Sequence, residues 1–137
     1  MIKQHILYFN TNGRATIGIT EKVAEVVTVS KIITGLCQLF IHHTSASLII
    51  CENADPTVRQ DLENFTSRWI QDGDKIFQHN AEGIDDMSAH LRTIFTQSGL
   101  SIPITDGQLA LGNWQGVFLW EHRFGHFKRK ITVTLIG

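Results

Sequence analysis

The order of helical and strand-like segments is the sequence feature that most constrains the fold. A doubly wound parallel sheet has a helix after each strand, but the helices predicted here fall between groups of strands. The sequence therefore predicts the α+β class, with mainly antiparallel pairing of about six or seven strands and two or three helices. Strands are predicted over residues 3–9, 35–43, 46–51, 100–105, 108–111, 114–121 and 128–136, and helices from 20 to about 30, from 55 to about 71 and from 85 or 86 to 99.

Local signals place the two later helices. Asp55 followed by Pro56 is typical of a helix start, because an acidic N-cap accepts backbone N–H groups and proline suits the first helical position. Apolar residues then recur at helical spacing and predict a buried stripe in each helix. The stripe of the first comprises Val58, Leu62, Phe65 and Trp69, and that of the second comprises Met87, Leu91, Ile94 and Phe95.

Composition excludes several classes of protein. The 137 residues predict one domain, residues 1–137, with 42% hydrophobic and 18% charged residues. The net charge of −1 gives no overall electrostatic basis for binding nucleic acid or a membrane. No apolar run reaches the ~20 residues of a membrane helix, and no signal peptide is recognised. Cys37 and Cys51 are interpreted as small buried residues in reduced cytosol, which predicts a cytoplasmic location.

Polar residues gather where one predicted strand ends and the next begins. His42 and His43 are followed there by Thr44 and Ser45. Successive residues of a strand point to opposite faces, so at most one of the two histidines can share a site with a given neighbour. The structural alternative is a histidine that hydrogen-bonds to the backbone at a strand end.

Two further groups of polar residues stand out. One lies just before the helix predicted to start at Asp55, and the other lies around Trp114. Glu52 and Asn53 precede the helix start, where free N–H groups favour anions. Glycines flank Trp114 and Gln115, which could stack on a heterocycle and bind its edge. Glu121 ends the following apolar strand, a position suited to a metal ligand or a general base. Loop hydrogen bonding of Asn53 and core packing of Trp114 are the structural alternatives.

A loop histidine, His79, and a helix histidine, His90, enclose a segment that contains Glu82, Asp85 and Asp86. Imidazole and carboxylate groups are ligands of divalent metals. The spacing matches no established zinc motif, so a metal site and a solvated polar segment are both open interpretations.

Cationic residues gather near the end of a chain that is otherwise close to neutral. Arginine beside hydroxyl groups suits phosphate binding, whereas charges that guard a sheet edge are the structural alternative. His122 and His126 lack such a context and are interpreted as surface residues. The cationic group comprises Arg123, Lys128, Arg129 and Lys130.

Several of these motifs, taken in order, resemble one protein family. They are His-Thr-Ser-Ala-Ser at 43–47, Glu-Asn-Ala-Asp-Pro-Thr-Val-Arg at 52–59, Asp-Asp-Met-Ser-Ala-His at 85–90, Gly-Asn-Trp-Gln-Gly at 112–116 and Glu-His-Arg at 121–123. The sequence resembles the YjbQ-like family, often named the secondary thiamine-phosphate synthase family, from about residue 2 to 136. The ordered set makes the resemblance specific, although no single motif would.

The resemblance implies a curved, sandwich-like antiparallel sheet system, a homotrimer, and a polar pocket that fits a divalent metal ion, magnesium or zinc. The implied activity joins hydroxymethylpyrimidine diphosphate to thiazole phosphate and releases diphosphate. On this interpretation the metal ligands are His43, His79 and His90, and the catalytic residues are Glu121, Asn53 and His43. The residues that bind the phosphorylated substrates are Thr44, Ser45, Trp114, Gln115, Arg123 and Arg129.

Two other functions are compatible with the same residues. A metal-dependent hydrolase of a small phosphorylated or amide substrate would use the histidines and carboxylates to activate water. A non-catalytic, metabolite-binding trimer would hold such a molecule without turnover. Phosphate release without ring joining would distinguish the first, and tight binding without turnover would distinguish the second.

Overall fold

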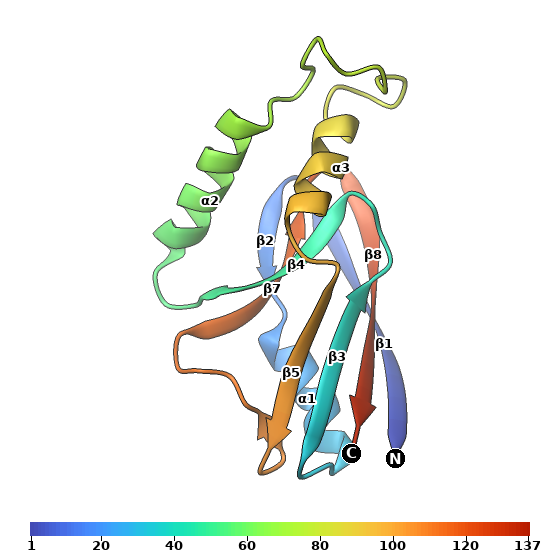
Figure 1. Cartoon of the computed structure of the whole chain (residues 1–137), viewed down its shortest axis with the longest axis vertical. Helices are drawn as coiled ribbons and strands as arrows, with labels where there is room; N and C mark the ends of the chain where they lie inside the picture. The colour runs from blue at the N-terminus through green and yellow to red at the C-terminus, as the bar shows by residue number, and fades with distance from the viewer.

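The computed structural model describes residues 1–137 and has the architecture that the order of segments predicts (Figure 1). All strand pairs are antiparallel, which confirms the α+β class. The elements are β1 (Ile2–Asn12), β2 (Ala15–Gly18), α1 (Thr20–Ser30), β3 (Gly35–Ile41), β4 (Ala46–Glu52), α2 (Pro56–Trp69), α3 (Asp86–Phe95), β5 (Gly99–Thr105), β6 (Gln108–Leu109), β7 (Gln115–Glu121) and β8 (His126–Ile136).

The strands form two sheets. One has five strands in the order β1-β8-β3-β5-β6, and the other has three in the order β2-β7-β4. The short strand β2, which is not among the predicted strands, pairs with β7. Asp106 and Gly107 both adopt positive φ between β5 and β6, as the predicted hairpin turn requires. Both ends of the chain lie at the same end of the large sheet (Figure 1).

The core lies between the inner faces of the two sheets and α1. Val23 and Val27, one turn apart on α1, are buried in it. Strand residues supply the remainder at every second position, the period of a strand with one face turned inward. They include Cys37, Leu39 and Ile41 on β3, Ile102 and Ile104 on β5, Val117 and Leu119 on β7, and Ile131, Val133 and Leu135 on β8. None of the helices has the length and apolar character that spanning a membrane requires.

The buried stripe predicted for α2 is wrong. Asp55 caps the helix as expected, with its carboxylate accepting the Thr57 N–H at 2.9 Å. However, α2 contains no buried residue, and Phe65 and Trp69 are 58% and 56% exposed. The helix stands to one side of the small sheet (Figure 1), and polar contacts of Glu63 hold it there. Helical spacing predicted the stripe but not which face of α2 would meet the sheet.

The inward face predicted for α3 is also wrong in part. Ile94 and Phe95 are 73% and 60% exposed, and Phe95 packs at the surface against Trp69, with ring centroids 4.7 Å apart. The buried face of α3 carries small and charged residues instead, including Arg92, which is 0% exposed. Arg92 can be buried because its guanidinium forms two hydrogen bonds with Glu63 of α2.

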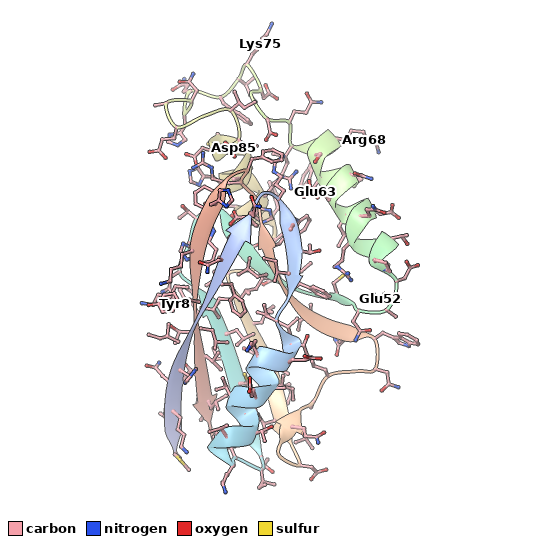
Figure 2. All side chains as sticks on the ribbon, turned by 180° about the vertical axis from the view of Figure 1, so that it is seen from behind. Tyr8, Glu52, Glu63, Arg68, Lys75 and Asp85 are labelled. Atoms are coloured by element: carbon pink, nitrogen blue, oxygen red, sulfur yellow. The ribbon has the colours of Figure 1, made fainter.

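The pairing of β4 with β7 determines where the polar motifs lie. Glu121 is opposite Ala46 at one end of this pair, and Gln115 is opposite Glu52 at the other end. At ~3.3 Å per residue, the two ends of β7 are roughly 20 Å apart. Figure 2 labels Glu52 beside the start of α2 and Asp85 at the level of the opposite end of that helix. The motifs therefore form two groups within one chain.

Candidate metal centre

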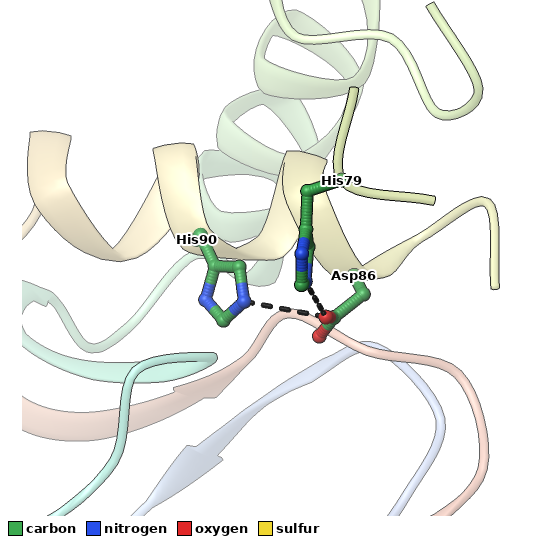
Figure 3. Close-up of side chains that lie close together, drawn as sticks. All are labelled: His79, Asp86 and His90. Carbon is green, nitrogen blue, oxygen red and sulfur yellow. Dashed lines mark hydrogen bonds and ion pairs between the residues drawn. The ribbon is translucent and has the colours of Figure 1, made fainter. Parts of the chain in front are cut away.

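Two histidines and one aspartate converge at the start of α3 (Figure 3). The Asp86 Oδ2 atom lies 2.6 Å from His79 Nε2 and 3.3 Å from His90 Nε2. The three potential ligand atoms are all within 4.8 Å of one another. The Asp86 side chain is 4% exposed, whereas those of His79 and His90 are 48% and 28% exposed. The cluster thus has a buried carboxylate with two imidazoles that reach the surface.

Local sequence explains how this cluster forms. Asp86 and His90 are four residues apart on α3, so they lie on the same face of the helix. His79 comes from the long connection between α2 and α3. His90 Nδ1 is 2.9 Å from the Thr44 carbonyl oxygen, an acceptor that fixes the proton on Nδ1. Nε2, which lies 3.3 Å from Asp86, is then the ring nitrogen that would be available to a metal ion.

The donor set fits a divalent metal ion. Two imidazole nitrogens and one carboxylate are a common set for zinc and related ions, whereas magnesium prefers oxygen ligands throughout. The carbonyl behind His90 is the kind of outer contact that orients metal-binding histidines. Of the two metals expected from the sequence, these donors favour zinc.

Neighbouring charges keep the carboxylates of this region ionised. Arg123 lies 3.1 Å from Asp85 and 3.5 Å from Asp86. Burial raises the pKa of Asp86, but the hydrogen bond to His79 and the charges of His90 and Arg123 outweigh it and hold the pKa below its ordinary value. The pKa of Asp85 is lowered likewise, because hydrogen bonds from Arg123 and the Phe124 N–H outweigh burial. Arg123 is therefore committed to these carboxylates.

His43 lies near this cluster but outside it. Its Nε2 accepts the Lys130 backbone N–H at 2.7 Å, which leaves the proton on Nδ1. The three histidines predicted as ligands therefore do not converge. Asp86, and not His43, is the third member of the cluster with His79 and His90. Burial, with the charge of Arg129, lowers the pKa of His43 below 6.5.

A cavity of about 420 Å³ adjoins the cluster. Thr44 links the two, because its carbonyl accepts from His90 while the residue itself lines the cavity. Its lining brings together four of the predicted site residues, which are His43, Thr44, Ser45 and Arg129.

Glu121 and Arg129 form a buried ion pair below this cavity. Glu121 is 0% exposed and Arg129 is 4% exposed. The Glu121 carboxylate accepts from Arg129 Nε at 2.7 Å and from the Thr11 hydroxyl at 2.6 Å. Arg129 also donates to the Ser45 hydroxyl oxygen at 3.0 Å. Both charged groups are thus engaged within the protein, and they position Ser45.

Asn53, Trp114 and Gln115 lie at the other end of the β4–β7 pair. The Asn53 backbone N–H donates to the Trp114 carbonyl at 3.0 Å, and the Gln115 side-chain oxygen accepts the Gly112 N–H at 2.8 Å. Asn53 Nδ2 bonds to two further carbonyls of the same loop at 3.4 Å. These polar groups hold the two connections together, while Trp114 is 65% exposed.

The interpretation of His122 as a surface residue is wrong, while His126 is exposed as expected. His122 is 0% exposed and its Nε2 lies 2.7 Å from the Ser47 hydroxyl. His122 directly follows β7 and is buried like the end of that strand. No motif in the sequence predicts this burial. The proximity of Asp86 to His90 is predictable from the sequence, because Asp86 precedes His90 by one helical turn.

The fold and the cluster define an α+β domain with a candidate metal centre formed by two histidines and a carboxylate. The chain belongs to the UPF0047 YjbQ-like family, whose model matches residues 5–137. A UPF0047 protein of Synechocystis sp. is 46% identical over 98% of this chain and 91% of its own. The UPF0047 protein YjbQ of Escherichia coli O157:H7 is 43% identical, over 75% of this chain and 74% of its own. A conserved hypothetical protein of Thermus thermophilus has the same fold, with a TM-score of 0.85 and 33% identity over 96% of this chain and 99% of its own.

Proposed function

We propose that the protein is a metal-assisted transferase that joins hydroxymethylpyrimidine diphosphate to thiazole phosphate and releases diphosphate. The observation that carries the proposal is the position of the His79–Asp86–His90 cluster beside a cavity lined by hydroxyl groups. A site for a cation next to donors for phosphate oxygens suits a reaction whose main demand is a stabilised leaving group.

Several side chains of the cavity have groups free for substrate. Ser45 Oγ accepts from Arg129 and so keeps its own O–H for a phosphate oxygen. His43 keeps an Nδ1–H donor because its Nε2 accepts from Lys130. A divalent metal held by His79, Asp86 and His90 would supply positive charge to the leaving diphosphate. Glu121 would act by positioning Arg129 and Ser45, not by contact with substrate.

The decisive experiment is an assay of the metal-loaded protein with both substrates. We expect thiamine phosphate and diphosphate in equal amounts, and a loss of at least about 100-fold in rate for His90→Ala. His126→Ala, a change of an exposed histidine elsewhere, is the matched control and should leave the rate unchanged. Absence of ring joining by the zinc- and magnesium-loaded proteins would contradict the proposal.

The second candidate function is the metal-dependent hydrolase. A metal ion held by His79, Asp86 and His90 alone would keep a coordination position for water, as in catalytic zinc sites, and this favours a hydrolase. Phosphate release from one substrate in the absence of the other would identify this activity. Saturable binding without any turnover would instead identify a metabolite-binding protein.

The first prediction concerns zinc binding by the His79–Asp86–His90 cluster. Asp86→Asn and His90→Ala should each weaken zinc binding by more than about 100-fold, because each removes one of three ligands and outer contacts alone account for about 10–100-fold. Titration with a competing chelator measures the affinity. The melting temperature of His90→Ala should change little, since the His90 side chain is 28% exposed, whereas Asp86→Asn alters a buried carboxylate and should lower it. Unchanged zinc affinity in both variants would show that the cluster is an ordinary surface ion pair.

A homotrimer with sites between subunits is the second prediction. Trp114 lies far from His90 within one chain and is exposed, so a neighbouring subunit would have to bring the two together. Light scattering should give about three chain masses, and mixing Trp114→Ala with His90→Ala chains should restore part of the activity. One chain mass at micromolar concentration would contradict the trimer. No recovery despite verified subunit exchange would contradict the shared site.

A further inference from the structure

We propose that the cleft between α2 and the small sheet binds a small oxyanion, a carboxylate or phosphate group, through Arg59. The cleft has a volume of about 390 Å³. None of its lining residues lines the cavity beside the metal cluster. The proposal therefore does not rest on the synthase activity. Its principal lining residues are Thr16, Pro56, Arg59, Gln60, Glu63 and Trp120.

The cleft exists because α2 turns a polar face toward the sheet. Pro56, Arg59, Gln60 and Glu63 recur at helical spacing and all line it. The apolar residues of α2 lie on another face, so they do not fill the space by packing. The opposite wall comes from β2 and from Trp120 of β7, which is 3% exposed. The result is a cleft with a rigid indole on one side and polar side chains on the other.

Arg59 is a cation of this cleft that no carboxylate of the chain neutralises. Its Nη1 is excluded from solvent and has no hydrogen-bond partner. The guanidinium lies over the Phe118 ring, 4.6 Å from its centroid, which restricts its position. Four other arginines each pair with a carboxylate, namely Arg14, Arg92, Arg123 and Arg129.

Glu63 lies in the same cleft but its carboxylate is already engaged. One oxygen accepts from Arg92 at 3.1 Å and from the Trp120 indole at 3.2 Å. The other accepts from Arg92 at 2.8 Å. Arg59 is thus left for an external partner. A guanidinium presents paired donors that match the two oxygens of a carboxylate or phosphate, so an oxyanion is the ligand that this residue would recognise.

The test uses the full-length protein and NMR detection of the Trp120 indole N–H. Inorganic phosphate and acetate are titrated separately at constant ionic strength. We expect a saturable shift of the indole resonance with at least one anion, and the two titrations identify which oxyanion is preferred. Arg59→Gln should weaken that binding at least 10-fold. Arg59→Lys should weaken it as well, because the charge stays while the paired donors are lost.

Arg68→Gln is the matched control, since Arg68 lies on α2 with Glu63 (Figure 2) but does not line the cleft. It should bind the anion as the unchanged protein does, and melting curves verify that every variant is folded. No saturable shift with either anion would overturn the proposal. Equal weakening by Arg68→Gln would also overturn it, because general charge would then explain the shift. An indole shift that depends on protein concentration without added anion would overturn it too, because a second copy would then fill the cleft.

Discussion

Arg129→Met is expected to lower the free energy of unfolding by about 3–5 kcal/mol, the typical cost of leaving one member of a buried ion pair without its partner. Arg129 is 4% exposed and Glu121 is 0% exposed. Arg129 donates to the Glu121 carboxylate and to Ser45. Without the guanidinium, Glu121 keeps only the Thr11 hydroxyl and the Arg123 N–H as hydrogen-bond partners. Urea denaturation monitored by circular dichroism measures the loss.

A double substitution separates pairing from packing. Glu121→Leu combined with Arg129→Met removes both charges, so it should be more stable than Arg129→Met alone. Lys128→Met, at an exposed position next to Arg129 in sequence, is the control and should change stability by less than about 0.5 kcal/mol. If Arg129→Met were as mild as this control, the ion pair between Arg129 and Glu121 would contribute little to stability.

Acidification from pH 7.5 to pH 5 should lower the free energy of unfolding by about 2 kcal/mol through His122. Burial, with the charge of Arg92, lowers the pKa of His122 from 6.5 to about 3. The folded protein keeps the ring neutral over this range, whereas the unfolded chain takes up a proton below about 6.5. Unfolding therefore binds a proton, so stability falls as the pH drops from about 6.5 toward about 3. The pKa of His43 is also lowered and contributes in the same direction.

Variants isolate the contribution of His122. His122→Gln cannot be protonated, so most of this pH dependence should disappear even though the variant itself is less stable. His126→Gln changes an exposed histidine and should keep the full dependence. Chemical denaturation at a series of pH values gives the slope for each protein. A slope between pH 7 and pH 5 that is unchanged in His122→Gln would show that other groups control the acid response.

The fold could be predicted where the signal is local. Asp55 and Pro56 mark the start of α2, and the alternation of Ile131, Val133 and Leu135 identifies the inner face of β8. The orientation of α2 could not be predicted in this way. Its apolar stripe is real, but whether the sheet meets that stripe or the polar face with Glu63 depends on contacts with Arg92 and Trp120, which are distant in sequence.

The same distinction applies to the candidate site. Asp86 and His90 are joined by one helical turn, so their proximity follows from sequence spacing. The distance between Trp114 and the His79–Asp86–His90 cluster depends on the register of β4 against β7, which no motif specifies. The burial of His122 could not be predicted for a related reason, because it depends on contacts with residues distant in sequence, such as Ser47.

The absence of buried side chains on α2 has a consequence for motion. The helix α2 could separate from the sheets at a small cost in hydrophobic free energy. The hydrogen bonds from Arg92 and Trp120 to Glu63 would have to break first. Amide protons of α2 would then exchange with solvent through local opening, whereas those of β3 and β8 would exchange only when the whole protein unfolds. Because β2 and β7 form the opposite wall, such fluctuations would widen the Arg59 cleft.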